Sequence, residues 1–143
     1  MPRQLATIGY EDATPARLIA ALRQARIATL VDVRAIANSR RPGFSKRALS
    51  AALEKAGIGY LHLKPLGTPV AGREAARSGR PEVMRRIVAA HLAGTEPHAA
   101  LAELTDLAKR QAVCLLCREA DPARCHRTLV AQAVGLPIAH LEP

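Results

Sequence analysis

The sequence contains very few aromatic side chains: one Phe, two Tyr and no Trp in 143 residues. Proteins that bind single-stranded nucleic acid stack successive bases on aromatic rings, so this sequence lacks the side chains for such a platform. No apolar run approaches the roughly 20 residues that a membrane-spanning helix needs. The first residues form no apolar leader segment. We therefore expect a cytoplasmic protein that makes no contact with a membrane.

Cysteine is also scarce, with Cys114, Cys117 and Cys125 as its three occurrences. An odd number of cysteines in a chain without a secretory signal argues against a disulfide framework. The sequence has no Cys-x-x-Cys pair, and its glycines fit neither a P-loop nor a dinucleotide-binding pattern. Ala123 stands where a phosphatase loop beginning at Cys117 would need Arg. We therefore expect neither ATP hydrolysis nor NAD chemistry, and the sequence predicts no cofactor.

Positive charge, in contrast, is abundant. The chain has 21 Lys and Arg residues against 12 Asp and Glu, a formal net charge of +9. Seventeen of the 21 are Arg, a bias that a GC-rich coding sequence would produce whatever the protein does. A basic protein nevertheless attracts phosphate groups and nucleic acid.

Short apolar segments alternate with amphipathic ones along the chain, which predicts strands alternating with helices. The expected strands are 5–9, 29–33, 59–63, 112–117 and 137–141. The expected helices begin at Pro15, after Ser45, at Pro81, at Pro97 and at Cys125. Residues 64–80 carry three Gly and two Pro without a clear period, which favours a long loop.

This order of elements predicts one α/β domain over residues 1–143. We expect a three-layer sandwich: a mostly parallel sheet of about five strands, with helices on both faces. The strands 29–33 and 112–117 are almost entirely apolar, so they should be buried on both faces at the centre of the sheet. Two helices should lie between the third and fourth strands.

Polar side chains follow the strands of the predicted sheet. In parallel sheets, ligands bind beyond the carboxyl ends of the strands, and these ends share one edge. His62 and Lys64 end the third strand. The residues that follow the other strands, and that we expect to line one cleft, are Tyr10, Glu11, Asp32, Arg34, Ser39, Arg40, Cys117, Glu119, Cys125, His126 and Arg127.

The same residues resemble the signatures of the DUF488 family. The segments are Thr7-Ile-Gly-Tyr-Glu11, Asp32-Val-Arg34, Ser39-Arg40, Phe44-Ser-Lys46, and Leu115-Leu-Cys-x-Glu119 with Cys125-His-Arg127. They occur in the family's order from about residue 6 to residue 133. The resemblance implies the fold and a site that includes Lys46, but it implies no reaction.

The chemistry of these side chains favours an anion site. Guanidinium groups of Arg34, Arg40 and Arg127 suit phosphate or carboxylate, and a helix beginning at Cys125 would add free N–H donors. In this interpretation Glu119 and Asp32 act as acid or base. The alternative is that both carboxylates form internal ion pairs with these arginines.

Cys125 and His126 complete the expected catalytic set, because a helix start lowers the pKa of a thiol. The alternative for Cys125 is inert packing between helix and sheet. Tyr10, Glu11, Ser39, Lys46, Cys117 and the three arginines would bind the ligand.

A metal site is the rival interpretation of the same segment. Cys117, Cys125 and His126, with His62, could supply four ligands for zinc. Adjacent residues such as Cys125 and His126 rarely both point at one ion, so the sequence predicts no metal.

The leading interpretation is a protein that binds or acts on a phosphate-bearing ligand, a nucleotide or a nucleic-acid end. The first alternative is a non-catalytic nucleic-acid-binding module that uses exposed arginines such as Arg73, Arg77, Arg85 and Arg86. The second is a thiol-redox or zinc protein. Whether the protein is an enzyme and whether it forms oligomers both stay open.

Overall fold

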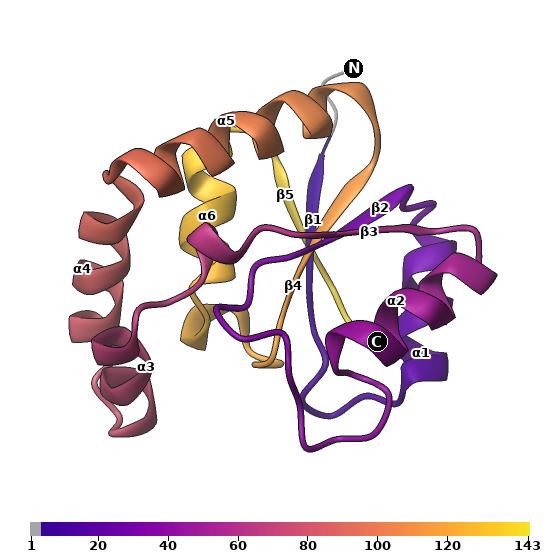
Figure 1. The fold of residues 1–143 in the computed structure, drawn as a ribbon, viewed down its shortest axis with the longest axis horizontal. Helices are drawn as coiled ribbons and strands as arrows, with labels where there is room; N and C mark the ends of the chain where they lie inside the picture. Colours follow the sequence, from indigo (N-terminus) through magenta and orange to yellow (C-terminus); the bar gives the residue numbers. More distant parts are fainter. Residues whose placement is uncertain (1–3) are drawn as a thin grey trace.

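The sheet is parallel throughout, as Figure 1 shows for a computed structural model that describes residues 4–143. Its five strands run in the order β3-β2-β4-β1-β5. They are β1 (Leu5–Gly9), β2 (Thr29–Asp32), β3 (Gly59–His62), β4 (Val113–Cys117) and β5 (Ile138–Leu141). All four strand pairs are parallel. The predicted α/β fold is confirmed.

The two most apolar strands lie inside the sheet. β4 is the middle strand, between β2 and β1, and β2 lies between β3 and β4. Every residue of β4 is buried. Strands inside a parallel sheet are covered on both faces, which is why their side chains are almost all apolar. This apolar run predicted that both strands lie inside the sheet.

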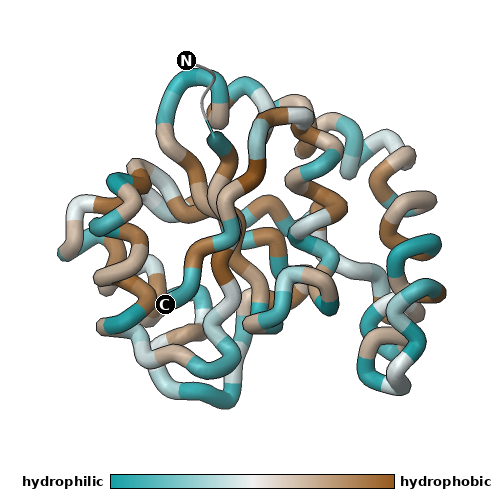
Figure 2. Tube along the Cα trace, turned by 180° about the vertical axis from the view of Figure 1, so that it is seen from behind, coloured by the Kyte–Doolittle hydropathy of each residue, from teal (hydrophilic) through white to brown (hydrophobic). Residues whose placement is uncertain are grey.

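Helices form a layer on each side of the sheet (Figure 1). On one side, α1 (Pro15–Gln24) and α2 (Lys46–Lys55) bury leucines such as Leu18 and Leu53. On the other side lie α4 (Pro81–Leu92), α5 (Thr95–Arg110) and α6 (Arg127–Val134), which bury Met84, Leu104 and Val130 among others. Figure 2 shows the hydrophobic residues gathered along the strands and the helix sides that face them.

The segment 64–80 is not the long loop that the sequence predicted. It holds a short 3-10 helix, η1 (Lys64–Leu66), and a two-turn helix, α3 (Val70–Arg77). The two prolines do not interrupt either helix: Pro65 lies in the first turn of η1, and Pro69 precedes α3, positions where a missing N–H breaks no helical hydrogen bond. The insertion between β3 and β4 therefore holds three α-helices rather than two.

The helix expected to begin at Cys125 begins two residues later. α6 starts at Arg127, and Cys125 instead ends a 3-10 turn, η2 (Pro122–Arg124). The side chain of Asp121 caps this turn by accepting a hydrogen bond from the amide of Ala123 at 2.9 Å. The Asp-Pro pair thus forms a turn of its own before the helix. Within residues 4–143, no helix is both long enough and apolar enough to cross a membrane.

Candidate functional site

A cleft of about 690 Å³ lies at the carboxyl edge of the sheet, where the ends of β1, β2 and β4 meet α3 and the start of α4. Its volume falls in the range of small-molecule sites, about 300–1,000 Å³. Six arginines and two glutamates line it: Arg34, Arg40, Arg73, Arg77, Arg118 and Arg124, with Glu11 and Glu119.

The structure brings most of the predicted site residues to this cleft. Those that line it are Tyr10, Glu11, Arg34, Arg40, Cys117, Glu119, Cys125 and His126. Asp32, Ser39, Lys46 and Arg127 are not in its lining. Asp32, Ser39 and Arg127 have partners behind the cleft wall. Lys46, the first residue of α2, is exposed on the surface outside the cleft.

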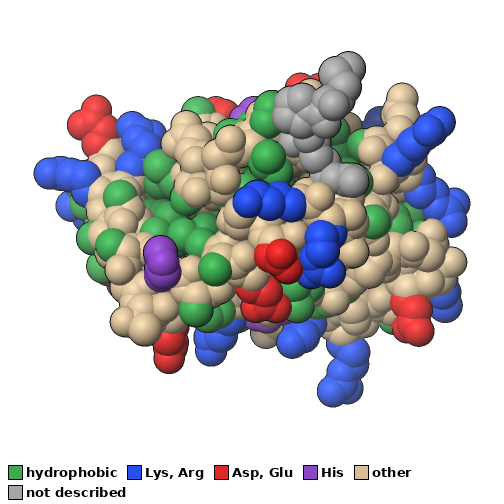
Figure 3. Space-filling view, turned by 90° about the horizontal axis from the view of Figure 1, so that it is seen from above, with side chains coloured by type: hydrophobic (Ala, Val, Ile, Leu, Met, Phe, Trp, Pro, Cys, Tyr) green, Lys and Arg blue, Asp and Glu red, His purple; other side chains and the backbone are tan. Residues whose placement is uncertain are grey.

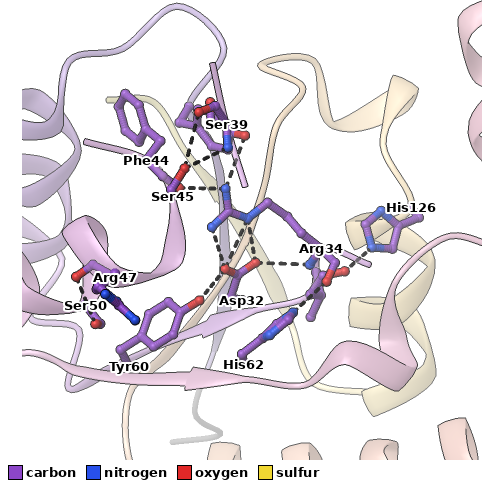
Figure 4. Close-up of polar contacts among 12 residues, drawn as sticks. Asp32, Arg34, Ser39, Phe44, Ser45, Arg47, Ser50, Tyr60, His62 and His126 are labelled. Atoms are coloured by element: carbon purple, nitrogen blue, oxygen red, sulfur yellow. Dashed lines mark hydrogen bonds and ion pairs between the residues drawn. The ribbon is translucent and has the colours of Figure 1, made fainter. Parts of the chain in front are cut away.

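Asp32 is the centre of a buried polar network (Figure 4). Its carboxylate accepts hydrogen bonds from Arg34, Nε to Oδ1 at 2.9 Å and Nη2 to Oδ2 at 2.6 Å, and from the Tyr60 hydroxyl at 2.5 Å. Asp32 is completely buried and Arg34 is 6% exposed. The internal ion pair left open by the sequence is therefore present for Asp32, which is not in the cleft lining. Within residues 4–143, Glu119 forms no such pair.

The pKa values of its two partners follow from this pairing. Burial disfavours the charge on Arg34, but the hydrogen bonds and charge of Asp32 outweigh it and raise the pKa of Arg34. Burial first, and then the hydrogen bond to Asp32, raises the pKa of Tyr60. The buried Asp32 carboxylate thus keeps the Arg34 guanidinium charged and the Tyr60 hydroxyl protonated.

The guanidinium of Arg34 is held by several groups of the protein. Besides Asp32, it donates to the Phe44 carbonyl at 2.7 Å and to the Tyr10 hydroxyl at 3.3 Å. Tyr10 stacks on Phe44 with ring centroids 4.6 Å apart. Arg34 therefore has partners within the wall of the cleft, and its predicted contact with a phosphate stays a prediction.

Ser39 also supports the wall, in the loop before α2. Its amide donates to the Ser45 hydroxyl at 3.0 Å, and its own hydroxyl accepts from the Arg41 amide at 3.1 Å. Arg41 in turn donates to the Tyr10 carbonyl at 2.7 Å. These bonds hold the loop that presents the exposed Arg40 to the cleft.

Arg127 is buried beneath the segment that follows β4. One guanidinium nitrogen, Nη1, contacts the Cys117 sulfur at 3.2 Å and the Glu119 carbonyl, and Nη2 contacts the Ala120 carbonyl at 3.3 Å. Within residues 4–143, its Nε has no hydrogen-bond partner. Burial lowers the pKa of Arg127. This arginine positions the Cys117–Ala120 backbone and is not in the cleft lining.

The three cysteines have different environments. Cys114 is completely buried against α1 and α2, and burial raises the pKa of its thiol. Cys117 and Cys125 form a disulfide, whereas the odd number of cysteines had argued against disulfides. The cysteine count could not reveal this contact, because it depends on the turn η2 bringing Cys125 back to the end of β4.

His126 lies beside this sulfur pair. Its Nδ1 is 3.6 Å from the Cys125 sulfur, and its Nε2 is 2.6 Å from the Val33 carbonyl. Burial lowers the pKa of His126 to about 4, so the ring is neutral at neutral pH. His62 is elsewhere, with Nε2 2.8 Å from the Arg34 carbonyl.

Four cleft arginines were not predicted as site residues: Arg73, Arg77, Arg118 and Arg124. The first two were assigned to an exposed nucleic-acid surface, but helix α3 places them on the cleft. Two donors, Asn38 and Thr68, were also missed. The available signal was the spacing of Arg73 and Arg77, four residues apart and therefore on one face of a helix.

The family of the chain is shown by a match over most of its length. The model of the family described as "Domain of unknown function DUF488" matches residues 14–134. The chain belongs to the DUF488 family. The match includes α1 through α6, while the segment Thr7–Glu11 precedes it. No curated protein and no solved structure matches this DUF488 protein.

Proposed function

We propose that this DUF488 protein binds a phosphate-bearing ligand in the cleft at the carboxyl edge of the sheet. The observation that carries the proposal is the charge of the lining, six arginines against two glutamates. Arg34 is neutralised by Asp32. In the described chain, 4–143, the other five form no ion pair.

The arrangement of these five arginines suits an anion with several oxygens. Arg40 comes from the loop after β2, Arg73 and Arg77 from α3, and Arg118 and Arg124 from the segment after β4. Arginine forks bind phosphate oxygens in pairs. Groups on three separate segments around one cavity can surround a phosphate, which a flat basic surface cannot do.

The apolar part of the lining favours a ligand larger than free phosphate. Ile36, 59% exposed, lines the cleft together with Ala76, Pro81 and Met84. A nucleoside 5′-monophosphate or the phosphorylated end of a nucleic acid has both a charged and a flat apolar part. The arginines of the lining would contact the charged part, and its apolar residues would contact the flat part.

Two residues are the proposed acid and base if the cleft catalyses a reaction. Glu119 is half-buried and lines the cleft, where its Oε2 lies 3.4 Å from the Cys117 sulfur. Glu11 is exposed, and its Oε1 accepts a hydrogen bond from the Ala120 amide at 3.3 Å. Asp32 is excluded from this role because its oxygens are occupied by Arg34 and Tyr60.

The test compares two double variants that remove the same charge. Calorimetric titration with adenosine 5′-monophosphate is carried out on the wild type, on Arg73→Ala/Arg77→Ala and on Arg85→Ala/Arg86→Ala. Arg85 and Arg86 are exposed on α4 and lie outside the cleft lining. Each lost charged hydrogen bond is worth about 1.5–3 kcal/mol, so we expect the first variant to bind at least about tenfold more weakly.

The control should bind within about twofold of the wild type, because exposed charges far from the ligand are screened by salt. Equal losses in the two variants would show that the net charge alone attracts the nucleotide. That result would favour the surface-binding module over the cleft.

A further inference from the structure

Three donors that suit a soft metal converge at the base of the cleft. Cys117 ends β4, and Cys125 and His126 lie between η2 and α6. The Sγ atoms and one imidazole nitrogen all lie within 4.8 Å of one another, and all three residues are buried. Thiolates and a neutral imidazole are the donors that zinc prefers in proteins.

The hydrogen bonds of His126 orient its free nitrogen toward the sulfurs. A backbone carbonyl only accepts hydrogen bonds, so Nε2, 2.6 Å from the Val33 carbonyl, carries the proton. Nδ1 is therefore the nitrogen with the lone pair, and it lies 3.6 Å from the Cys125 sulfur. Ligands bound about 2.0–2.3 Å from a tetrahedral zinc are separated by this kind of distance. A histidine whose second nitrogen is held by a carbonyl is the usual arrangement at metal sites.

Each sulfur also has an N–H donor. Nη1 of Arg127 lies 3.2 Å from the Cys117 sulfur, and the amide nitrogen of Arg127 lies 3.4 Å from the Cys125 sulfur. Such donors stabilise the thiolate form, which is the form that binds metal. The two cysteines and His126 thus each have an outer hydrogen-bond partner.

The backbone spacing of the two cysteines suits a shared ion. Their Cα atoms are 7.3 Å apart, beyond the range of about 4.4–6.8 Å in which disulfides usually form. Two thiolates bound to one zinc, each at about 2.3 Å, can span a wider gap than a direct sulfur–sulfur bond.

We propose that, after a thiol or phosphine reductant has converted the disulfide into two thiols and has itself been oxidised, Cys117, Cys125 and His126 form a three-ligand site for Zn²⁺ or a similar divalent ion. Binding displaces the protons of the two thiols, whose negative charges balance the charge of the ion. All three ligands line the cleft, so the fourth coordination position faces it, as in catalytic zinc sites. The sequence objection that Cys125 and His126 are adjacent does not hold for this backbone, since their ligand atoms face each other. This inference goes beyond the proposed anion site and does not depend on it.

The test uses Co²⁺ as a coloured substitute for zinc. The protein is reduced with a phosphine, freed of metal with a chelator and titrated with Co²⁺ in a phosphate-free buffer. We expect one ion per chain, with thiolate-to-cobalt charge-transfer bands and the visible bands of tetrahedral cobalt, both lost on adding Zn²⁺. Cys117→Ser and Cys125→Ser should abolish the charge-transfer bands or halve them, and His126→Gln should weaken Co²⁺ binding by at least about tenfold. Cys114→Ala, a change outside the group of three ligands, should leave the spectrum unaltered.

A second measurement on the wild type guards against variants that fail to fold. Iodoacetamide labelling of the reduced protein is followed by mass spectrometry with and without Zn²⁺. Zinc should protect Cys117 and Cys125 and leave the labelling of Cys114 unchanged. No cobalt bands in the reduced wild type, or equal protection of all three cysteines, would overturn the metal site. Arg73→Ala/Arg77→Ala should keep the cobalt spectrum, so failure of the anion site and of the metal site can be told apart.

Discussion

The side chains that the sequence marked as functional divide into two groups with different physical roles. Arg34, which lines the cleft, is paired with the buried Asp32, whereas Arg40 and Glu119 line the cleft and form no ion pair within residues 4–143. Sequence reasoning identified both groups, because charged residues after apolar strand ends stand out. It could not separate them, since the separation depends on which partners the fold supplies.

The buried ion pair leads to a prediction about stability. Asp32→Ala should lower the free energy of unfolding by about 3–5 kcal/mol, because it leaves Arg34 as a buried charge without its partner. The matched control is Asp106→Ala, which removes the exposed helix pair between Arg110 and Asp106 and should cost at most about 1 kcal/mol. Urea unfolding of both variants measures the difference. Similar losses would mean that Arg34 finds another partner or water.

The raised pKa of Tyr60 gives a second prediction at this scale. In the folded protein Tyr60 keeps its proton through the pH at which a free tyrosine ionises, about 10. Above that pH the unfolded chain binds fewer protons than the folded one. The contribution of Tyr60 to the free energy of unfolding therefore falls as the pH rises. The chain has two tyrosines, so the phenolate absorbance of the wild type minus that of Tyr60→Phe isolates Tyr60. Ionisation of this tyrosine at pH 10 in the native protein would contradict the role of the Asp32 network.

At the scale of elements, the strands and the helices α1, α2 and α4 were predictable, whereas α3 and the start of α6 were not. β1 has the predicted bounds, and each of the other strands differs from its predicted bounds by one residue at one end. The inner strands β2 and β4 stood out because strands covered on both faces carry continuous apolar runs. Helix α3 was missed because its buried positions are Gly72 and Ala75, which give almost no hydrophobic signal. An added Cβ on Gly72 would lie 2.6 Å from the Thr68 side chain, so close packing requires glycine at this position. The same glycine removes the hydrophobic pattern by which a helix could have been predicted.

The end of β1 approaches the segment after β4 so closely that only glycine fits. A Cβ on Gly9 would lie 1.8 Å from the Glu119 carbonyl oxygen and 2.9 Å from Nη1 of Arg127. Gly9→Ala must therefore displace the backbone at Glu119, and we expect a loss of stability of about 3 kcal/mol or more. The control is Gly94→Ala, where the nearest atom to the added Cβ is 3.2 Å away. Thermal unfolding of the two variants tests this, and equal melting temperatures would show that the segment adjusts freely.

On the scale of the whole molecule, the net charge of +9 says less about function than its distribution. Figure 3 views the molecule from above, the side of α5, where basic side chains are spread among acidic and apolar ones. The cleft at the opposite edge of the sheet instead gathers six arginines from segments far apart in the sequence. The total charge can be counted from the sequence, but the collection of these arginines in one cleft depends on the fold, and on α3 above all.

This distribution of charge predicts how the affinity of the protein for a single-stranded nucleic acid depends on the length of the strand. A 5′-phosphorylated single strand should bind by its end, so its affinity should be nearly the same for two nucleotides as for twenty. The logarithm of the affinity should fall with the logarithm of salt concentration at a slope of about −0.7 for each phosphate contacted, which limits the slope to about −2 if one end occupies the cleft. Removing the 5′-phosphate should lower the affinity by at least about tenfold, because the terminal phosphate carries the contacts to the cleft arginines. Fluorescence anisotropy with labelled strands measures all three quantities. An affinity that rises steadily with length, with a steepening salt dependence and no effect of the 5′-phosphate, would instead indicate binding along the whole basic surface.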